Sequence, residues 1–87
     1  MSGDRRRVAL AFGEVLRAAR RERGVSQDEL SKRCDFDRTY PSLLERGLRH
    51  PTLWMLLRLA EALGTPAECL VTDTVARLST ADIAASQ

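Results

Sequence analysis

Apolar residues recur at helical spacing along most of the chain, and no stretch keeps the alternation of apolar and polar residues that marks a strand. In the N-terminal third the spacing is i, i+3, i+4 and i+7, formed by Phe12, Val15, Leu16 and Ala19. Gly24 follows this run, at a place where a glycine commonly ends a helix. The pattern therefore predicts an all-α fold whose first helix covers residues 9–23.

A capping box that begins at Ser26 predicts a second, shorter helix. The Ser26 hydroxyl would accept a hydrogen bond from the Glu29 amide, and the Glu29 carboxylate would reach back to the Ser26 amide. Leu30 and Cys34 form the inner face of this helix. Asp35 follows, and aspartate tolerates the left-handed backbone conformation that a tight turn needs.

The third helix has two possible starting points. If Asp37 is the N-cap, the helix runs to Arg46, and Pro41 falls inside it, where its missing amide forfeits a hydrogen bond. If Thr39 is the N-cap, Pro41 lies in the first turn, where proline is tolerated, and Arg38 lies off the helix. With either start, two short helices joined by a tight turn have the layout of a helix-turn-helix.

Two more helices are predicted after a short basic loop. Thr52 is a good N-cap for a helix over residues 53–63, which Gly64 ends. Residues 65–68, Thr-Pro-Ala-Glu, form another capping box with proline at the favoured first position, and they open a fifth helix.

With 87 residues, the chain is long enough for one domain. Its composition, 44% apolar and 30% charged, is typical of a folded soluble chain. We expect residues 8–71 to form the domain. Residues 1–7, which carry three consecutive arginines, are expected to form a flexible basic arm, and residues 72–87 a tail or a short extra helix, because the apolar pattern weakens there.

The net charge of +2 is unevenly distributed along the chain. Residues 1–50 hold twelve Lys and Arg against eight Asp and Glu, which gives +4, whereas residues 51–87 hold two against four, which gives −2. A chain polarised in this way favours an anionic partner such as nucleic acid, although a basic stretch can also be a solvated face.

The residues that catalysis or metal binding would need are sparse. Cys34, Cys69 and the single His50 lie too far apart in sequence for a zinc motif, and no nucleophile has a base at a recognisable spacing. We therefore expect no enzymatic activity, no metal and no cofactor. No segment is apolar enough for a signal peptide or a membrane span, so a cytoplasmic location is expected.

A series of short motifs runs through residues 12–70: Phe12-Gly13, Arg17, Arg20, Gly24–Gln27, Glu29-Leu30, Arg38–Tyr40, Glu45–Gly47, Pro51–Leu53 and Leu59–Gly64. In this order and spacing they resemble the lambda-repressor or Cro-type family, also called the XRE type. The run from Arg38 to Gly47 is most similar to the small controller proteins of restriction-modification operons. The resemblance implies a five-helix DNA-binding domain, with the helix-turn-helix at its second and third helices, and a bacterial or phage transcriptional regulator.

In a helix-turn-helix protein the start of the recognition helix enters the DNA major groove, so its first residues meet base edges. Here these residues are Arg38, Thr39, Tyr40, Ser42 and Leu43. An arginine can bind both O6 and N7 of guanine, and a threonine methyl or an aromatic ring can touch a thymine methyl. The alternative for Arg38 is a phosphate contact or a solvated charge.

Three further residues are expected to contact phosphates. The resemblance implies this role for Gln27, at the start of the second helix. Arg46 and Arg49 flank the end of the recognition helix and could hold the phosphates beside the groove, although Arg46 could instead balance the helix C-terminus. The resemblance also pairs Arg20 with Glu45 as a structural ion pair.

The helix over residues 53–63 is apolar nearly all round, and Trp54, Met55 and Leu57 exceed what one core face needs. They could be the interface of a homodimer on a palindromic or pseudo-palindromic operator, or they could be covered by the C-terminal segment with Val75 and Leu78. A third alternative is that Trp54 is exposed without such a role.

Two rival functions stay open for the chain. It could be an antitoxin or another protein-interaction module, with a toxin or a polymerase as its protein partner. It could also be a helix-turn-helix that has lost DNA binding, for which Pro41 is the main argument.

Overall fold

The computed structural model describes the backbone of residues 2–86 and the side chains of residues 4–79. Five helices follow one another: α1 (Ser2–Glu22), α2 (Gln27–Cys34), α3 (Tyr40–Glu45), α4 (Leu53–Leu63) and α5 (Ala67–Ser86). Residues 2–86 contain no strand, which confirms the predicted all-α fold with five helices.

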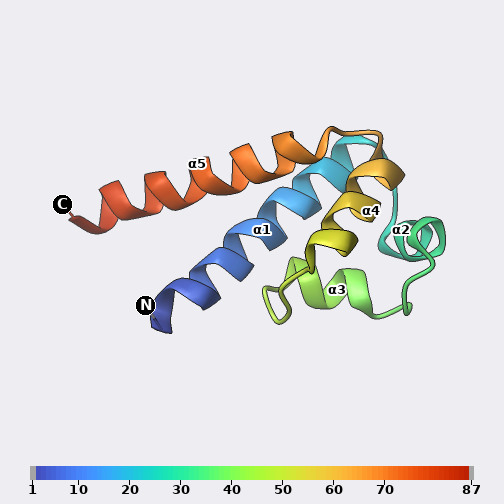
Figure 1. Ribbon diagram of the computed structural model, residues 1–87, viewed down its shortest axis with the longest axis horizontal. Helices are drawn as coiled ribbons and strands as arrows, with labels where there is room; N and C mark the ends of the chain where they lie inside the picture. Colours follow the sequence, from blue (N-terminus) through green and yellow to red (C-terminus); the bar gives the residue numbers. More distant parts are fainter. Residues whose placement is uncertain (1, 87) are drawn as a thin grey trace.

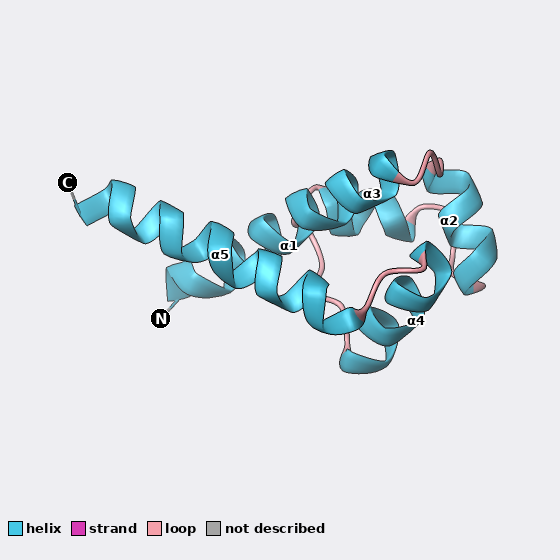
Figure 2. Cartoon of the chain, turned by 90° about the horizontal axis from the view of Figure 1, so that it is seen from above, coloured by secondary structure: helices cyan, strands magenta, loops and turns pink. Residues whose placement is uncertain are grey.

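The two long helices α1 and α5 lie side by side, and the three shorter helices gather along one part of α1 (Figures 1 and 2). The helix α3 packs against α1, and α4 packs against both α2 and α5. In Figure 1, α2 lies at one end of the molecule with α3 and α4 next to it, and the N-terminal end of α1 and the C-terminal end of α5 lie at the other.

Each helix contributes one leucine to the centre of the core. These leucines have less than 2% of their surface exposed to solvent: Leu16, Leu30, Leu44, Leu59 and Leu70. Smaller or partly buried apolar residues, among them Phe12, Val15, Val25 and Cys34, fill the space around them. Fully burying a leucine stabilises a fold by about 1.5–3 kcal/mol, so this set of side chains ties all five helices together.

The caps of α2 and α4 lie where local sequence signals predicted them. The Ser26 hydroxyl accepts from the Glu29 amide at 3.0 Å, and the Thr52 hydroxyl accepts from the Met55 amide at 3.1 Å. The Glu29 carboxylate does not complete the capping box, because it pairs with Arg33 at 3.2 Å. That pair joins residues four apart on the exposed face of α2.

The start of α3 follows the second of the two predicted alternatives. The helix begins at Tyr40 with Thr39 as N-cap, so Pro41 lies in its first turn. Asp37 caps the preceding turn instead: its carboxylate accepts from the Thr39 amide at 2.9 Å and from the Thr39 hydroxyl at 2.7 Å. These two hydrogen bonds, the amide first, lower the pKa of Asp37.

The two ends of the domain are more helical than predicted. Residues 2–7 form the first turns of α1 and not a flexible arm. Asp4 lies in the first turn, where a carboxylate is favourable, and pairs with Arg7 at 3.3 Å. At the other end, α5 runs unbroken from Ala67 to Ser86, so the predicted boundary after residue 71 falls inside a helix. Within the described part of the chain, no helix is long and apolar enough to cross a membrane.

Candidate nucleic-acid interface

One face of the α3 region points away from the core. Its residues are spaced i, i+3, i+4 and i+7 and form what we call the outer row: Thr39, Ser42, Leu43 and Arg46. Thr39 and Arg46 are exposed, and Ser42 and Leu43 are half-buried. Pro41 and Leu44, on the opposite side of α3, are buried. The outer row therefore brings together four of the residues predicted to contact DNA.

Arg38 lies in the turn before α3, outside the helix. Its side chain is exposed, and its Nε atom is 4.0 Å from a carboxylate oxygen of Asp28 on α2. A pair at that distance in solvent contributes little, so the guanidinium can leave it for another partner. Arg38 stands beside the outer row as a solvent-facing cation.

The structure turns Tyr40 away from the outer row and towards α4. Its hydroxyl donates to the Met55 sulfur at 2.8 Å, and its ring forms a T-shaped pair with Phe36 with centroids 5.1 Å apart. Burial raises the pKa of Tyr40, and the nearby charge of Arg49 partly offsets this. In this position Tyr40 braces the start of α3 against α4, and its predicted base contact would need a different side-chain position.

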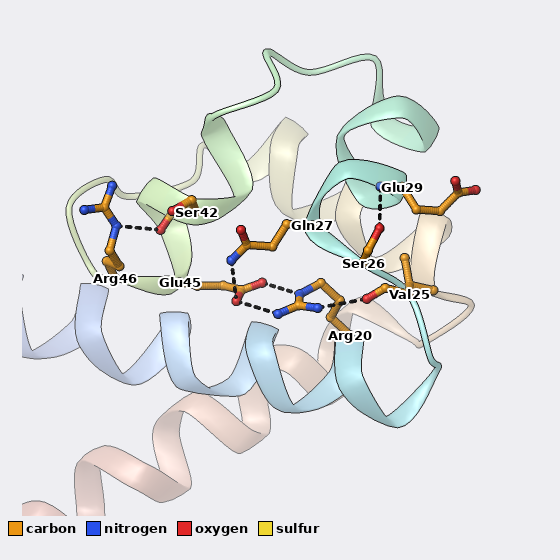
Figure 3. A network of polar contacts seen from close by, with 8 residues as sticks. All are labelled: Arg20, Val25, Ser26, Gln27, Glu29, Ser42, Glu45 and Arg46. Carbon is orange, nitrogen blue, oxygen red and sulfur yellow. Dashed lines mark hydrogen bonds and ion pairs between the residues drawn. The ribbon is translucent and has the colours of Figure 1, made fainter.

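The predicted ion pair of Arg20 and Glu45 is present and joins α1 to the end of α3 (Figure 3). Arg20 donates from Nε to Glu45 Oε2 at 2.6 Å and from Nη2 to Oε1 at 3.0 Å. Its Nη1 atom donates to the Val25 carbonyl at 2.9 Å. Only 11% and 4% of the two side chains are exposed, and the hydrogen bond to Glu45 is the main reason that the pKa of Arg20 is raised.

Gln27 belongs to the same network, which its predicted phosphate contact did not anticipate. Its side-chain nitrogen donates to Glu45 Oε1 at 3.1 Å (Figure 3). Glu45 therefore holds α1, α2 and α3 in one arrangement. The contact with Glu45 uses one of the two N–H groups of the Gln27 amide, so the other N–H and the backbone amides are the donors left for a phosphate at this end of α2.

Arg46 and Arg49 are exposed at the C-terminal end of α3 and in the loop that follows. Arg46 Nε donates to the Ser42 carbonyl at 3.4 Å, and Arg49 Nη1 donates to the Leu48 carbonyl at 3.0 Å. Neither contact neutralises the positive charge. Both side chains therefore stand free to meet an anionic backbone next to the outer row.

Gly13 and Gly47 set how closely α3 approaches α1, a role that sequence reasoning missed. A Cβ atom on Gly13 would lie 2.5 Å from the Leu44 carbonyl oxygen and 2.6 Å from that of Glu45. A Cβ atom on Gly47, whose φ is +73°, would lie 2.6 Å from the Leu10 side chain. A lone glycine inside a strongly helical pattern was the available signal for Gly13.

The helix α4 presents an exposed apolar face made of Leu53, Trp54 and Leu57, with 71%, 60% and 50% of their surfaces exposed. The Trp54 ring leans on Phe36, with centroids 6.4 Å apart, and the Arg58 guanidinium lies 5.6 Å from its centre. Met55 is half-buried under Tyr40 and does not share this face.

The C-terminal segment does not cover Trp54, contrary to one of the two alternatives. Val75 and Leu78 instead line a groove of about 280 Å³ together with Val8 of α1 and Leu56 of α4. The reason is that α5 continues as a helix that packs against α1.

Comparison with known proteins supports the same reading of the fold. A family model described as a helix-turn-helix domain matches residues 11–71. The uncharacterized HTH-type transcriptional regulator y4dJ of Sinorhizobium fredii is 49% identical over 55 residues, 63% of this chain and 71% of that protein.

Two solved controller proteins are similar in structure. The restriction-modification controller C.AhdI of Aeromonas hydrophila has a TM-score of 0.69 at 37% identity, covering 71% of this chain and 94% of that one. The controller C.Esp1396I, solved as a tetramer with its natural 35 base-pair operator, has a TM-score of 0.67 at 26% identity, covering 78% and 95%.

The family match spans the helix-turn-helix, α4 and most of α1, and the similarity to C.AhdI confirms the predicted resemblance to restriction-modification controllers. The chain therefore belongs to the helix-turn-helix family of DNA-binding transcriptional regulators.

Proposed function

We propose that the protein is a sequence-specific regulator that binds double-stranded DNA as a homodimer on a palindromic or pseudo-palindromic operator. The observation that carries this proposal is the outer row of α3, a solvent-facing strip of a short helix with exposed arginines beside both of its ends. A helix of this size fits the major groove of B-DNA, which is about 12 Å wide.

In this proposal Thr39, Ser42 and Leu43 face base edges, and Arg38 reaches the base or phosphate beside the start of α3. Hydroxyls hydrogen-bond to base edges, and a leucine side chain can pack against a thymine methyl group. Arg46 and Arg49 neutralise phosphates at the other end of the helix, which fixes how α3 lies in the groove.

Pro41 does not argue for a lost DNA-binding function. It lies in the first turn of α3, where its missing amide would have had no intrahelical partner, and its ring is buried in the core. The recognition helix keeps a regular outer row, so the rival reading of a degenerate helix-turn-helix loses its main support.

A homodimer is supported by the exposed α4 face of Leu53, Trp54 and Leu57. Monomeric proteins rarely leave such apolar groups together in water, and one small domain contacts few bases. C.Esp1396I, which binds its operator as a tetramer, is a relative in which several copies share one DNA. We place the protein in the cytoplasm, where such an operator is accessible.

The same α4 face favours a second candidate, a contact with a different protein such as a toxin or a polymerase. The two are distinguished by the mass of the purified protein in solution. A dimer that Trp54→Asp dissociates supports the first candidate, and a monomeric wild type supports the second.

The DNA-binding proposal is tested by fluorescence anisotropy on a duplex at several salt concentrations. Affinity falls with salt, and each phosphate contact makes the slope of log affinity against log salt steeper by about 0.9. Arg46→Gln and Arg49→Gln should therefore each make the slope shallower by about that amount. Arg77→Gln is the matched control, because Arg77 is an exposed arginine of α5 paired with Glu14. A wild-type affinity that does not change with salt would overturn the proposal.

A further inference from the structure

The arginines that precede Val8 lie on different rows of α1, and one of these rows leads towards the loop after α3. Arg6, Leu10 and Gly13 follow the spacing i, i+4 and i+7, so they share one face of the helix. Arg5 lies one position earlier and belongs instead to the row of Ala9, whose side chain is buried. Arg6 and Arg5 carry the same charge and are both exposed, but they lie on different faces of α1.

The contacts of this row show where Arg6 lies relative to α3. Gly13 meets the carbonyls of Leu44 and Glu45 at the end of α3, and Leu10, one turn earlier in α1, meets Gly47 in the loop. The part of α1 that precedes Leu10 therefore lies beyond the C-terminal end of α3. Arg6 lies a further turn on, about 6 Å along the helix axis at 1.5 Å per residue.

The N-terminal end of α1 extends beyond α3 and its loop (Figure 1). Arg6 consequently adds an exposed cation to the side of α1 that faces Gly47, and Arg46 and Arg49 lie on either side of Gly47 in the sequence. Its backbone is held in a helix, so a contact made by Arg6 would not carry the entropic cost of ordering a free arm. Arg7 differs from it because it is already paired with Asp4.

From this placement we infer that Arg6 is a phosphate-binding residue that extends the DNA contact beyond the segment held by the α3 loop. The contact is electrostatic and independent of sequence, since phosphates carry no base information. The inference rests on the proposed function, because it assumes that α3 docks on DNA.

The test is the salt dependence of binding to a duplex, combined with hydroxyl-radical footprinting, for the wild type and three variants. Arg6→Gln should make the slope of log affinity against log salt shallower by about 0.9. It should also weaken binding equally for all sequences and remove protection at one edge of the footprint. Arg6→Lys should restore the wild-type slope, because lysine keeps the charge. Arg5→Gln should leave the slope and the footprint as in the wild type.

Two results would overturn the inference while the proposed function stands. In the first, Arg6→Gln binds with the wild-type slope and footprint. In the second, Arg5→Gln and Arg6→Gln make the salt slope shallower by the same amount. DNA binding would then depend on the net charge of this end of α1 and not on the row that faces the loop. If the wild type itself shows no salt-dependent binding, the proposed function fails and the inference fails with it. Circular dichroism of each variant verifies that α1 is retained.

Discussion

Because α3 approaches α1 closely at Gly13, the structure predicts that replacing this glycine by alanine destabilises the protein, whereas helix propensity alone predicts that it stabilises it. Gly13 lies in the middle of α1, and replacing a helix glycine by alanine ordinarily stabilises a protein by about 1 kcal/mol. Gly13→Ala would place a methyl group 2.5 and 2.6 Å from the carbonyl oxygens of Leu44 and Glu45. We expect this variant to be less stable than the wild type.

The size of the effect follows from these distances. Carbon and oxygen atoms pack at about 3.3–3.6 Å, so the end of α3 would have to move by roughly 1 Å. Both obstructing atoms belong to the backbone, and Glu45 is also held by two hydrogen bonds from Arg20. Overpacking of this kind costs about 1–3 kcal/mol, which exceeds or cancels the gain from helix propensity and leaves a net loss of up to about 2 kcal/mol.

Urea unfolding followed by circular dichroism measures this loss, and Ala18→Gly calibrates it. Ala18 is an exposed residue of the same helix, so its replacement reports helix propensity alone and should cost about 1 kcal/mol. Gly13→Ala should also weaken specific DNA binding, because a binding site tolerates displacements of only about 0.5 Å. A Gly13→Ala protein that is more stable by about 1 kcal/mol and binds DNA normally would refute the close-approach argument.

Three other predictions concern the core network, the cysteines and the α4 face. Glu45→Ala leaves Arg20 buried without its carboxylate and should cost about 3–5 kcal/mol in urea unfolding, whereas a cost under about 1 kcal/mol would mean that the pair acts like an exposed one. Cys69 is exposed and should react with a thiol reagent at neutral pH. Cys34 should react only on unfolding, because its side chain is buried out of reach of the reagent and burial also raises its pKa. Because the pKa of Cys34 is higher in the folded than in the unfolded protein, the protonated thiol contributes to the free energy of unfolding below the ordinary thiol pKa of about 8.5. That contribution is lost as the pH rises through the raised pKa. Trp54→Asp should lower the mass seen by light scattering, and an unchanged dimer would place the interface elsewhere.

Local signals predicted most helix boundaries of this chain. The hydroxyls of Ser26 and Thr52 cap α2 and α4, and Gly64 ends α4 with a φ of +65°. These features depend only on neighbouring residues, so the sequence contains enough information to place them. The start of α1 was predicted too late, because the arginine run does not itself distinguish a charged helix end from a free arm.

The site was harder to predict, because its geometry depends on residues far apart in sequence. The orientation of Tyr40 is set by Phe36 and Met55, and the second partner of Glu45, Gln27, comes from another helix. Neither contact leaves a periodic trace in the sequence. The Arg20 and Glu45 pair was accessible only because a family resemblance supplied it.

In the proposed function, two copies of the protein read DNA bases through the outer row of α3. Selection of bound sequences from a random pool of duplex DNA measures whether they do so. We expect an enriched motif with two-fold symmetry, whose half-sites lie about one helical turn apart, and a changed preference within each half-site for Ser42→Ala, since Ser42 belongs to the outer row. A pool that shows no enrichment, from protein that binds DNA in a salt-dependent way, would contradict it.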